Sequence, residues 1–168
     1  ENSRVFVDMN KTNVSLYDAI PGSCTIVEGI SPANHLKSIK NETEIKGFQN
    51  AVVKDGVALT KFYIWLEKQM AEGAQVTEIS AAEKLTALRA EQPQYIMDSF
   101  GTICGYAEHG AIVHYSATPE TDATLKPEGL LLIDSGAQYL DGTTDITRTI
   151  ALGEPTEQMK KDFTRVLK

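Results

Sequence analysis

The stretch at residues 129–150 constrains the fold more than any other part of the sequence. It reads GLLLIDSGAQYLDGTTDITRTI, so two strand-like runs flank an Asp-Gly turn signal at positions 141 and 142. In a hairpin closed by a two-residue loop, residues of the two strands that lie an odd number of positions apart share a face. Asp134 and Asp145 are eleven positions apart. We therefore predict a tight β-hairpin that presents both carboxylates on one face.

Two carboxylates directed at one point in an apolar setting repel each other and resist ionising together. Leu131, Leu132, Ile133 and Ile146 would supply that apolar setting. A shared proton or a bound cation removes the conflict, and oxygen ligands suit Mn²⁺, Mg²⁺ or Co²⁺ and can also serve Zn²⁺. The threonines at positions 143, 144, 147 and 149 could donate hydrogen bonds to the carboxylates and so support them as metal ligands.

A structural explanation remains open at this point, because most aspartates near turns serve the turn itself. Asp141 is such a residue, and Asp145 would fit the same description if it followed the turn into solvent. Asp134 fits it less well, because it directly follows four apolar residues.

Composition and charge restrict the class of protein. The chain has 168 residues with a formal charge of −7, which argues against binding to nucleic acid or to an anionic membrane surface. The two cysteines, Cys24 and Cys104, lie far apart and form no CxxC pattern. That usage fits a reducing, cytoplasmic compartment. No apolar run is long enough to span a membrane.

The order of elements predicts an α+β fold, with two long helices followed by antiparallel strands. Residues 1–35 form a small β-α-β-like fragment, which we expect to be the tail of a preceding domain and its linker; residues 36–168 form the main domain. Because the chain starts without Met and stops within an apparent helix, we expect a piece of a longer protein. The expected helices cover 41–73, 77–93 and the stretch from 156, the expected strands 100–104 and 111–115, and a loop 116–128.

Two histidines, His114 and His109, lie shortly before the hairpin that carries the two aspartates. His114 lies in the run AIVHY, where strand alternation would place it on the same face as Ile112. A lone histidine in an apolar strand is commonly a packed core residue, but its position just before the two aspartates favours a proton donor beside a metal-bound water. His109 lies in a loop flanked by glycines and is expected to be exposed.

The motifs, taken together, resemble a known family. The segments DSGAQY at 134–139, TTDITRT at 143–149 and GAIVHY at 110–115 are similar to those of the Xaa-Pro aminopeptidases, or aminopeptidases P, which are pita-bread metallopeptidases. Similar wording extends to SPANHLKSIKNETEI at 31–45, KDGVALTKFYIWLE at 54–67 and GEPTEQMKKDFTRVLK at 153–168. The resemblance implies the N-terminal half of the pita-bread fold over residues 36–168.

The resemblance also implies a site and a reaction. Asp134 would bind one metal of a dinuclear centre, Asp145 would bridge both metals, and His114 would assist proton transfer or stabilise the transition state. Two divalent ions, typically Mn²⁺ in the family, would activate water to hydrolyse the bond before a proline at the second position of a peptide.

The family completes its metal centre with one His and two Glu that would lie beyond Lys168, so the 168-residue chain by itself is expected to be inactive. The parent is expected to be a cytoplasmic homodimer. The alternatives are a metal-free pita-bread homologue, either a creatinase-like hydrolase or a peptide-binding module, and a prolidase.

Overall fold

The N-terminal part of the chain is a small unit with little core. The computed structural model describes residues 3–168, and the chain divides into compact units after Thr43. The first unit pairs two parallel strands, β1 and β2, across the short helix α1, and α2 follows. Val7 is the one buried residue in its described part. Our assignment of residues 1–35 to the tail of a preceding domain and its linker stays a prediction. The bounds are β1 Arg4–Val7, α1 Val14–Asp18, β2 Thr25–Glu28 and α2 Pro32–Ser38.

The second unit begins with the two predicted long helices, α3 (Glu42–Glu72) and α4 (Glu78–Ala90). Gly73 ends α3 with a left-handed φ of 67° that favours glycine. Thr77 caps α4, because its Oγ1 accepts from the backbone N–H of Ser80 at 3.2 Å while its own N–H donates to Ser80 Oγ at 2.8 Å. Both helix boundaries therefore follow from local side-chain chemistry.

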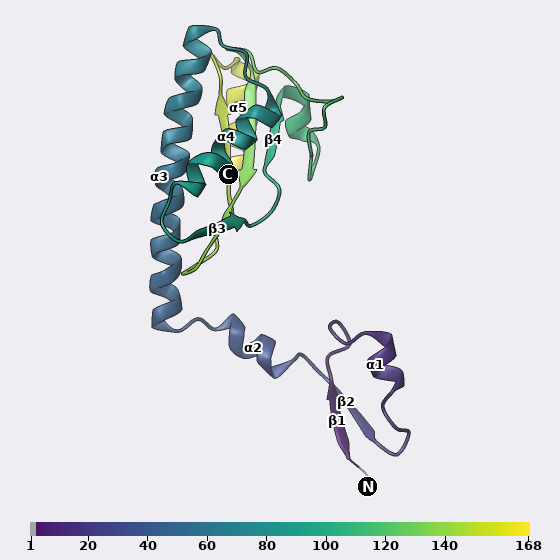
Figure 1. The fold of residues 1–168 in the computed structure, drawn as a ribbon. Coiled ribbons are helices and arrows are strands. Elements are labelled where there is room, and N and C mark those ends of the chain that lie inside the picture. The colour runs from purple at the N-terminus through teal and green to yellow at the C-terminus, as the bar shows by residue number, and fades with distance from the viewer. Residues whose placement is uncertain (1–2) are drawn as a thin grey trace. The chain divides into compact units, whose positions relative to one another are not determined.

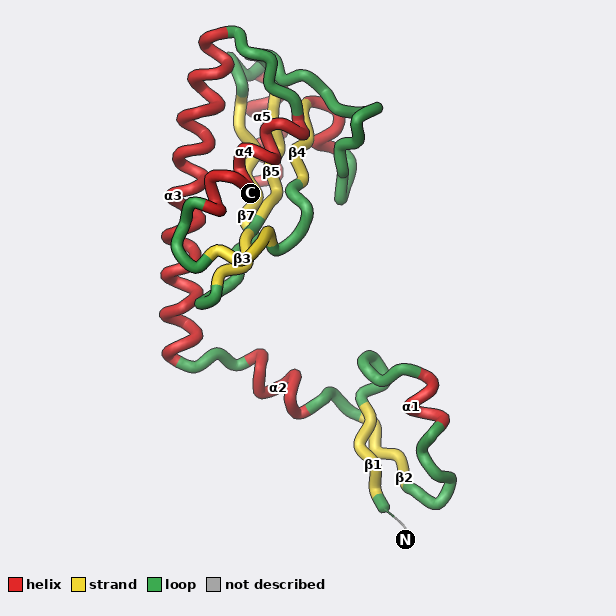
Figure 2. Tube along the Cα trace, in the orientation of Figure 1, coloured by secondary structure: helices red, strands yellow, loops and turns green. Residues whose placement is uncertain are grey.

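The predicted hairpin lies in a three-stranded antiparallel sheet of order β4-β5-β7 (Figure 2). This sheet lies alongside the long helix α3 (Figure 1). A second antiparallel pair joins β3 to β6. Tyr139 and Gly142 exchange backbone hydrogen bonds around a two-residue loop, as the Asp-Gly signal predicted. The strands are β3 Tyr95–Asp98, β4 Ile103–Tyr106, β5 Leu130–Ser135, β6 Ala137–Tyr139 and β7 Ile146–Ala151.

The main core lies between the long helices and one face of the sheet. Leu131 and Ile133 of β5 pack there with Phe62 and Leu66 of α3 and with Leu85 of α4. The last helix, α5 (Glu157–Leu167), lies against the other face, because its residues line a groove together with β5 and β7. Thr156 caps α5, which begins where the sequence predicted a helix. The sheet is therefore covered by α3 and α4 on one face, and only in part by α5 on the other, which we call the open face.

Two expectations about this unit were wrong in detail. The strand expected at 100–104 begins only at Ile103, as β4, because the chain first pairs with β6 as β3 up to Asp98 and then joins the other sheet. The strand expected at 111–115 is absent; the 3₁₀ helix η1 (Ala107–Ala111) and a turn occupy this stretch. Several large apolar side chains at the start of α3 are exposed, including Ile45 and Val52.

Within residues 3–168, no helix combines the length and the apolar character needed to cross a membrane.

Candidate metal and catalytic site

Asp134 projects from the open face of β5. Along this strand Leu131, Ile133 and Ser135 are buried against the helices, while Asp134 alternates to the opposite face and is half-buried. Ile103 of β4 and Thr147 of β7 are its cross-strand partners. The strand therefore turns the carboxylate away from the core, which explains how a charged residue can follow four apolar ones.

Asp145 lies on the same face, as the odd spacing predicted. Ser135 pairs with Ile146, and the backbone N–H of Thr144 donates to the carbonyl of Ala137 at 2.9 Å. The position between these two pairs sets Asp145 opposite Gly136, so its side chain alternates to the open face. Asp145 is exposed, which corrects the apolar setting expected for both aspartates.

The hydrogen bonds around the two carboxylates leave them open to a ligand. Thr147 Oγ1 donates to Asp134 Oδ1 at 2.8 Å, as expected for a threonine that orients the carboxylate. No residue of the described chain donates to Asp134 Oδ2 or to the carboxylate of Asp145. Carboxylate oxygens free of protein donors suit a hard divalent cation.

The backbone beside the aspartates is fixed by a close chain crossing at Gly136. A Cβ at this position would collide with the carbonyl oxygen of Thr144 and with Ser99 Oγ. Ser99 Oγ donates to the Thr144 carbonyl at 2.9 Å, and the N–H of Ala137 donates to Thr144 Oγ1 at 2.9 Å. Only glycine fits here, so the two strands approach closely between Asp134 and Asp145.

A buried ion pair lies behind the aspartates, on the helix side of the sheet. Arg89 of α4 donates from Nε and Nη2 to the two carboxylate oxygens of Asp55 on α3, at 2.6 and 3.1 Å. Arg89 Nη2 also donates to Ser135 Oγ at 3.1 Å. Tyr139 donates its hydroxyl to Asp55 at 3.3 Å, and burial, followed by the nearby Asp55 charge, raises the tyrosine pKa. Asp55, Arg89 and Ser135 are all 0% exposed.

Sequence reasoning missed this ion pair, although the helical spacing contains a signal for it. Asp55 lies four positions before Leu59 and seven before Phe62, and Arg89 lies four positions after Leu85. Both charges therefore fall on the apolar stripes of their helices.

His114 is placed by a turn, not by the strand predicted for it. Its φ is 57°, and its side chain is exposed and makes no hydrogen bond to the described residues. The chain turns back here because Gly105 lets Gly110 approach so closely that a Cβ on Gly105 would lie 2.9 Å from Gly110 Cα. The prediction that His114 shares a strand face with Ile112 was therefore wrong, because residues 112–115 do not form a strand.

A second buried carboxylate, Glu78, holds the segment that carries His114. It accepts from the backbone N–H groups of Tyr106 and Ala123 at 2.7 and 3.1 Å, and from the Tyr115 hydroxyl at 2.9 Å. His109 Nδ1 lies 2.9 Å from Glu78 Oε1, and its ring stacks on Tyr115 with centroids 4.6 Å apart. The prediction that His109 is exposed was wrong, since only 23% of its side chain is accessible.

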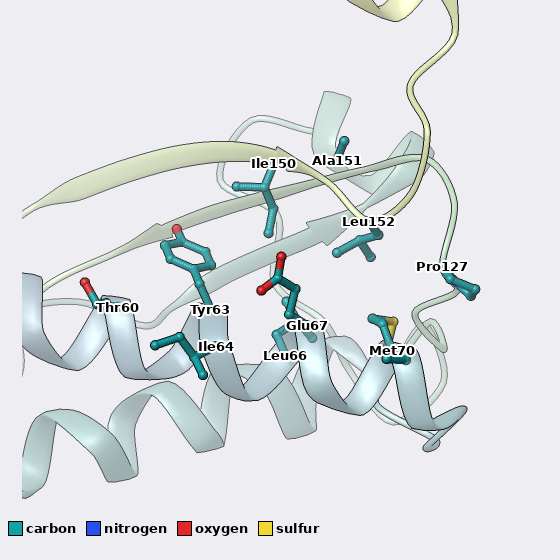
Figure 3. Close-up of a pocket in the computed structure, with 11 residues that line it drawn as sticks. Thr60, Tyr63, Ile64, Leu66, Glu67, Met70, Pro127, Ile150, Ala151 and Leu152 are labelled. Atoms are coloured by element: carbon teal, nitrogen blue, oxygen red, sulfur yellow. The ribbon is translucent and has the colours of Figure 1, made fainter.

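An apolar groove of about 550 Å³ lies between α3 and the end of β7, but it is not the candidate site. Tyr63, Met70 and Leu152 are among the residues that line it (Figure 3). Because it opens on the helix side of the sheet, it does not include Asp134 or Asp145.

Asp134 and Asp145 offer only part of a metal-binding set. Residues 3–168 contain no cluster of three or more His, Cys, Asp or Glu side chains arranged to hold a metal ion. Two carboxylates on one face fit a hard divalent cation, and further ligands are needed to complete its coordination.

Comparison with known proteins decides the family. Residues 46–168 match the model of metallopeptidase family M24. The chain belongs to this family. It is 48% identical over 149 residues to an Xaa-Pro aminopeptidase of Drosophila melanogaster, covering 89% of the chain and 24% of that protein. Aminopeptidase P2 of Arabidopsis thaliana is 42% identical, with 98% of the chain and 24% of the relative covered.

A solved structure gives the same answer for the fold. The X-prolyl aminopeptidase of Caenorhabditis elegans, described as a cytosolic enzyme with a dinuclear active site, superposes with a TM-score of 0.76 at 36% identity. The match covers 80% of this chain and 22% of that one. The pita-bread fold inferred from the sequence is thereby confirmed, and the chain spans about a quarter of the length of its relatives.

Proposed function

We propose that this chain supplies part of the dinuclear metal site of an Xaa-Pro aminopeptidase, which releases the N-terminal residue from peptides with proline at the second position. Asp134 and Asp145 are the residues of this chain that would hold the divalent cations. The observation that carries the proposal is the antiparallel register that places both aspartates on the open face. Membership in a metallopeptidase family and identity to Xaa-Pro aminopeptidases support the reaction class.

The chain's own residues hold and orient the site. Thr147 fixes one oxygen of Asp134, which directs the other oxygen toward a ligand. The crossing at Gly136 keeps the strand that carries Asp145 close to the strand that carries Asp134. When bound, two divalent cations lower the pKa of water and polarise the scissile carbonyl.

His114 is proposed to exchange a proton with the reacting groups or to stabilise charge near them. Its exposed imidazole has no protein partner among the described residues and can therefore act toward a substrate. Glu78 fixes Tyr115, the residue that follows His114, by accepting a hydrogen bond from its hydroxyl. This contact limits where His114 can move.

The remaining parts of the proposal concern the metal, the location and the assembly. We propose Mn²⁺ as the metal, a cytoplasmic location and a homodimeric parent that binds peptides and not nucleic acid. The cytosolic dinuclear relative supports the divalent metals and the location. The formal charge of −7 is unfavourable for nucleic-acid binding.

The test uses the full-length protein that contains this chain. Metal-free protein reloaded with Mn²⁺ should cleave an X-Pro peptide and leave the matching X-Ala peptide intact. Asp134→Asn and Asp145→Asn should each lower Mn²⁺ affinity by more than the roughly 10- to 100-fold typical of residues that only support a ligand. His114→Ala should reduce kcat and leave Mn²⁺ content unchanged.

Asp141→Asn is the matched control, because Asp141 lies in the hairpin turn and pairs with Lys54 at 2.6 Å. It should keep both metal and activity. Full Mn²⁺ binding by Asp134→Asn and Asp145→Asn would contradict the assignment of the ligands. Cleavage restricted to free dipeptides would favour a prolidase, and binding of peptides without metal or turnover would favour the metal-free homologue.

A further inference from the structure

The buried ion pair contacts the sheet directly behind the two aspartates. Ser135 follows Asp134 in β5 and pairs with Ile146, which follows Asp145. Its side chain points to the helix side, where its Oγ accepts from Arg89 Nη2 at 3.1 Å. Among the described residues, the one side-chain hydrogen bond from Arg89 to the sheet therefore lies at the strand position that adjoins both aspartates.

From this placement we infer that Arg89 is a positioning residue for the metal site, acting through Ser135 on Asp134 and Asp145. This inference rests on the proposed function. Asp55 fixes Arg89 by accepting from both Nε and Nη2, so the guanidinium cannot rotate without losing a buried charge partner. A fixed guanidinium in turn fixes the backbone of β5 at Ser135.

The two faces of the hairpin are constrained in complementary ways. On the open face, Thr147 orients the Asp134 carboxylate itself. On the helix side, Arg89 holds the backbone from which that carboxylate projects. A metal site needs its ligands placed before the cation arrives, and the groups that support ligands contribute to affinity for that reason. The ion pair thus links α3 and α4 to ligand geometry, beyond its role in helix packing.

Ser135→Ala in the full-length protein tests the inference, with Tyr139→Phe as the matched control. Each removes one hydroxyl from the same buried network, but the Tyr139 hydroxyl contacts Asp55 and not the strand beside Asp134. Calorimetric titration with Mn²⁺ should show about tenfold weaker binding for Ser135→Ala, the lower end of the effect of supporting residues. Tyr139→Phe should bind Mn²⁺ as the wild type does.

Amide hydrogen exchange of the metal-free proteins gives a second readout that does not depend on activity. Exchange at residues 134–136 should be faster in Ser135→Ala than in Tyr139→Phe. The double variant Asp55→Val/Arg89→Met replaces the ion pair with apolar side chains, a change that folded proteins commonly tolerate. It should fold and show the same loss of Mn²⁺ affinity as Ser135→Ala.

Equal Mn²⁺ affinity and equal exchange for Ser135→Ala and Tyr139→Phe would overturn the positioning role while leaving the proposed function intact. Wild-type affinity in the folded double variant would overturn it as well. A wild-type protein that binds no Mn²⁺ would overturn the proposed function and this inference with it.

Discussion

Arg89→Met should lower the free energy of unfolding by about 3–5 kcal/mol, because it leaves the Asp55 carboxylate buried without its cation. The magnitude follows from burial and geometry. Both side chains are 0% exposed, and the guanidinium meets the carboxylate through two hydrogen bonds of 2.6 and 3.1 Å. Removing Arg89 also leaves Ser135 Oγ without its donor. Water cannot reach either acceptor to replace what is lost.

An exposed ion pair at the same helices is the control. Lys61 of α3 meets Glu91, just after α4, at 3.0 Å, but their side chains are 50% and 54% exposed. Solvent screens such a pair, so Lys61→Met should lower the free energy of unfolding by about 1 kcal/mol or less. The double variant Asp55→Val/Arg89→Met should lie much closer to the wild type than Arg89→Met does, because it removes the unpaired charge.

Urea unfolding followed by circular dichroism measures all three differences, and equal slopes against urea would show that the unfolded states are comparable. A loss of free energy of unfolding in Arg89→Met no larger than that in Lys61→Met would refute the reasoning that a buried carboxylate left without its cation is costly.

Three further outcomes are expected. Gly136→Ala should lower the free energy of unfolding by about 1–3 kcal/mol, measured by urea unfolding, because the new Cβ collides with the Thr144 carbonyl oxygen. Gly101→Ala should change it little, because a Cβ there would meet open space. Similar losses at both sites would contradict the close approach of the strands at Gly136. Cys104 should resist a thiol-specific disulfide reagent at pH 8 while the less buried Cys24 reacts, because burial raises the Cys104 pKa to about 12; two reacting thiols in the folded protein would disprove this. The 168-residue chain alone should show no X-Pro turnover with added Mn²⁺, because residues 3–168 offer no group of three metal ligands; turnover comparable to that of the full-length protein would show that two aspartates suffice.

The parts of the fold that were predictable depend on local chemistry. Thr77 and Thr156 begin helices as caps, and Gly73 ends one. The two-residue loop fixed the hairpin register, and the register alone set Asp134 and Asp145 on one face. Each of these features is decided within about a dozen residues of sequence.

The missed parts depend on contacts between distant segments. His114 leaves the expected strand because Gly105 and Gly110 meet and because Glu78 holds His109 and Tyr115. The sequence around AIVHY contains no pattern from which those distant contacts could be predicted. The late start of β4 likewise follows from long-range pairing, because β3 pairs with β6 and β4 pairs with β5.

Buried charges form an intermediate case. Asp55 and Arg89 lie on the apolar stripes of their helices, which is a local signal, but their pairing requires both helices in place. Glu78 resembled an ordinary acidic residue in the first turn of a helix, where such residues are common. Its burial arises only when η1 and the loop at 116–128 fold over it.

The most direct test of whether Asp134 and Asp145 bind metal is an anomalous difference map from crystals of the full-length protein grown with Mn²⁺. We expect peaks on the open face of β5 and β7, within roughly 2.5 Å of carboxylate oxygens of both Asp134 and Asp145. Manganese peaks that lie elsewhere, with neither aspartate as a ligand, would contradict it.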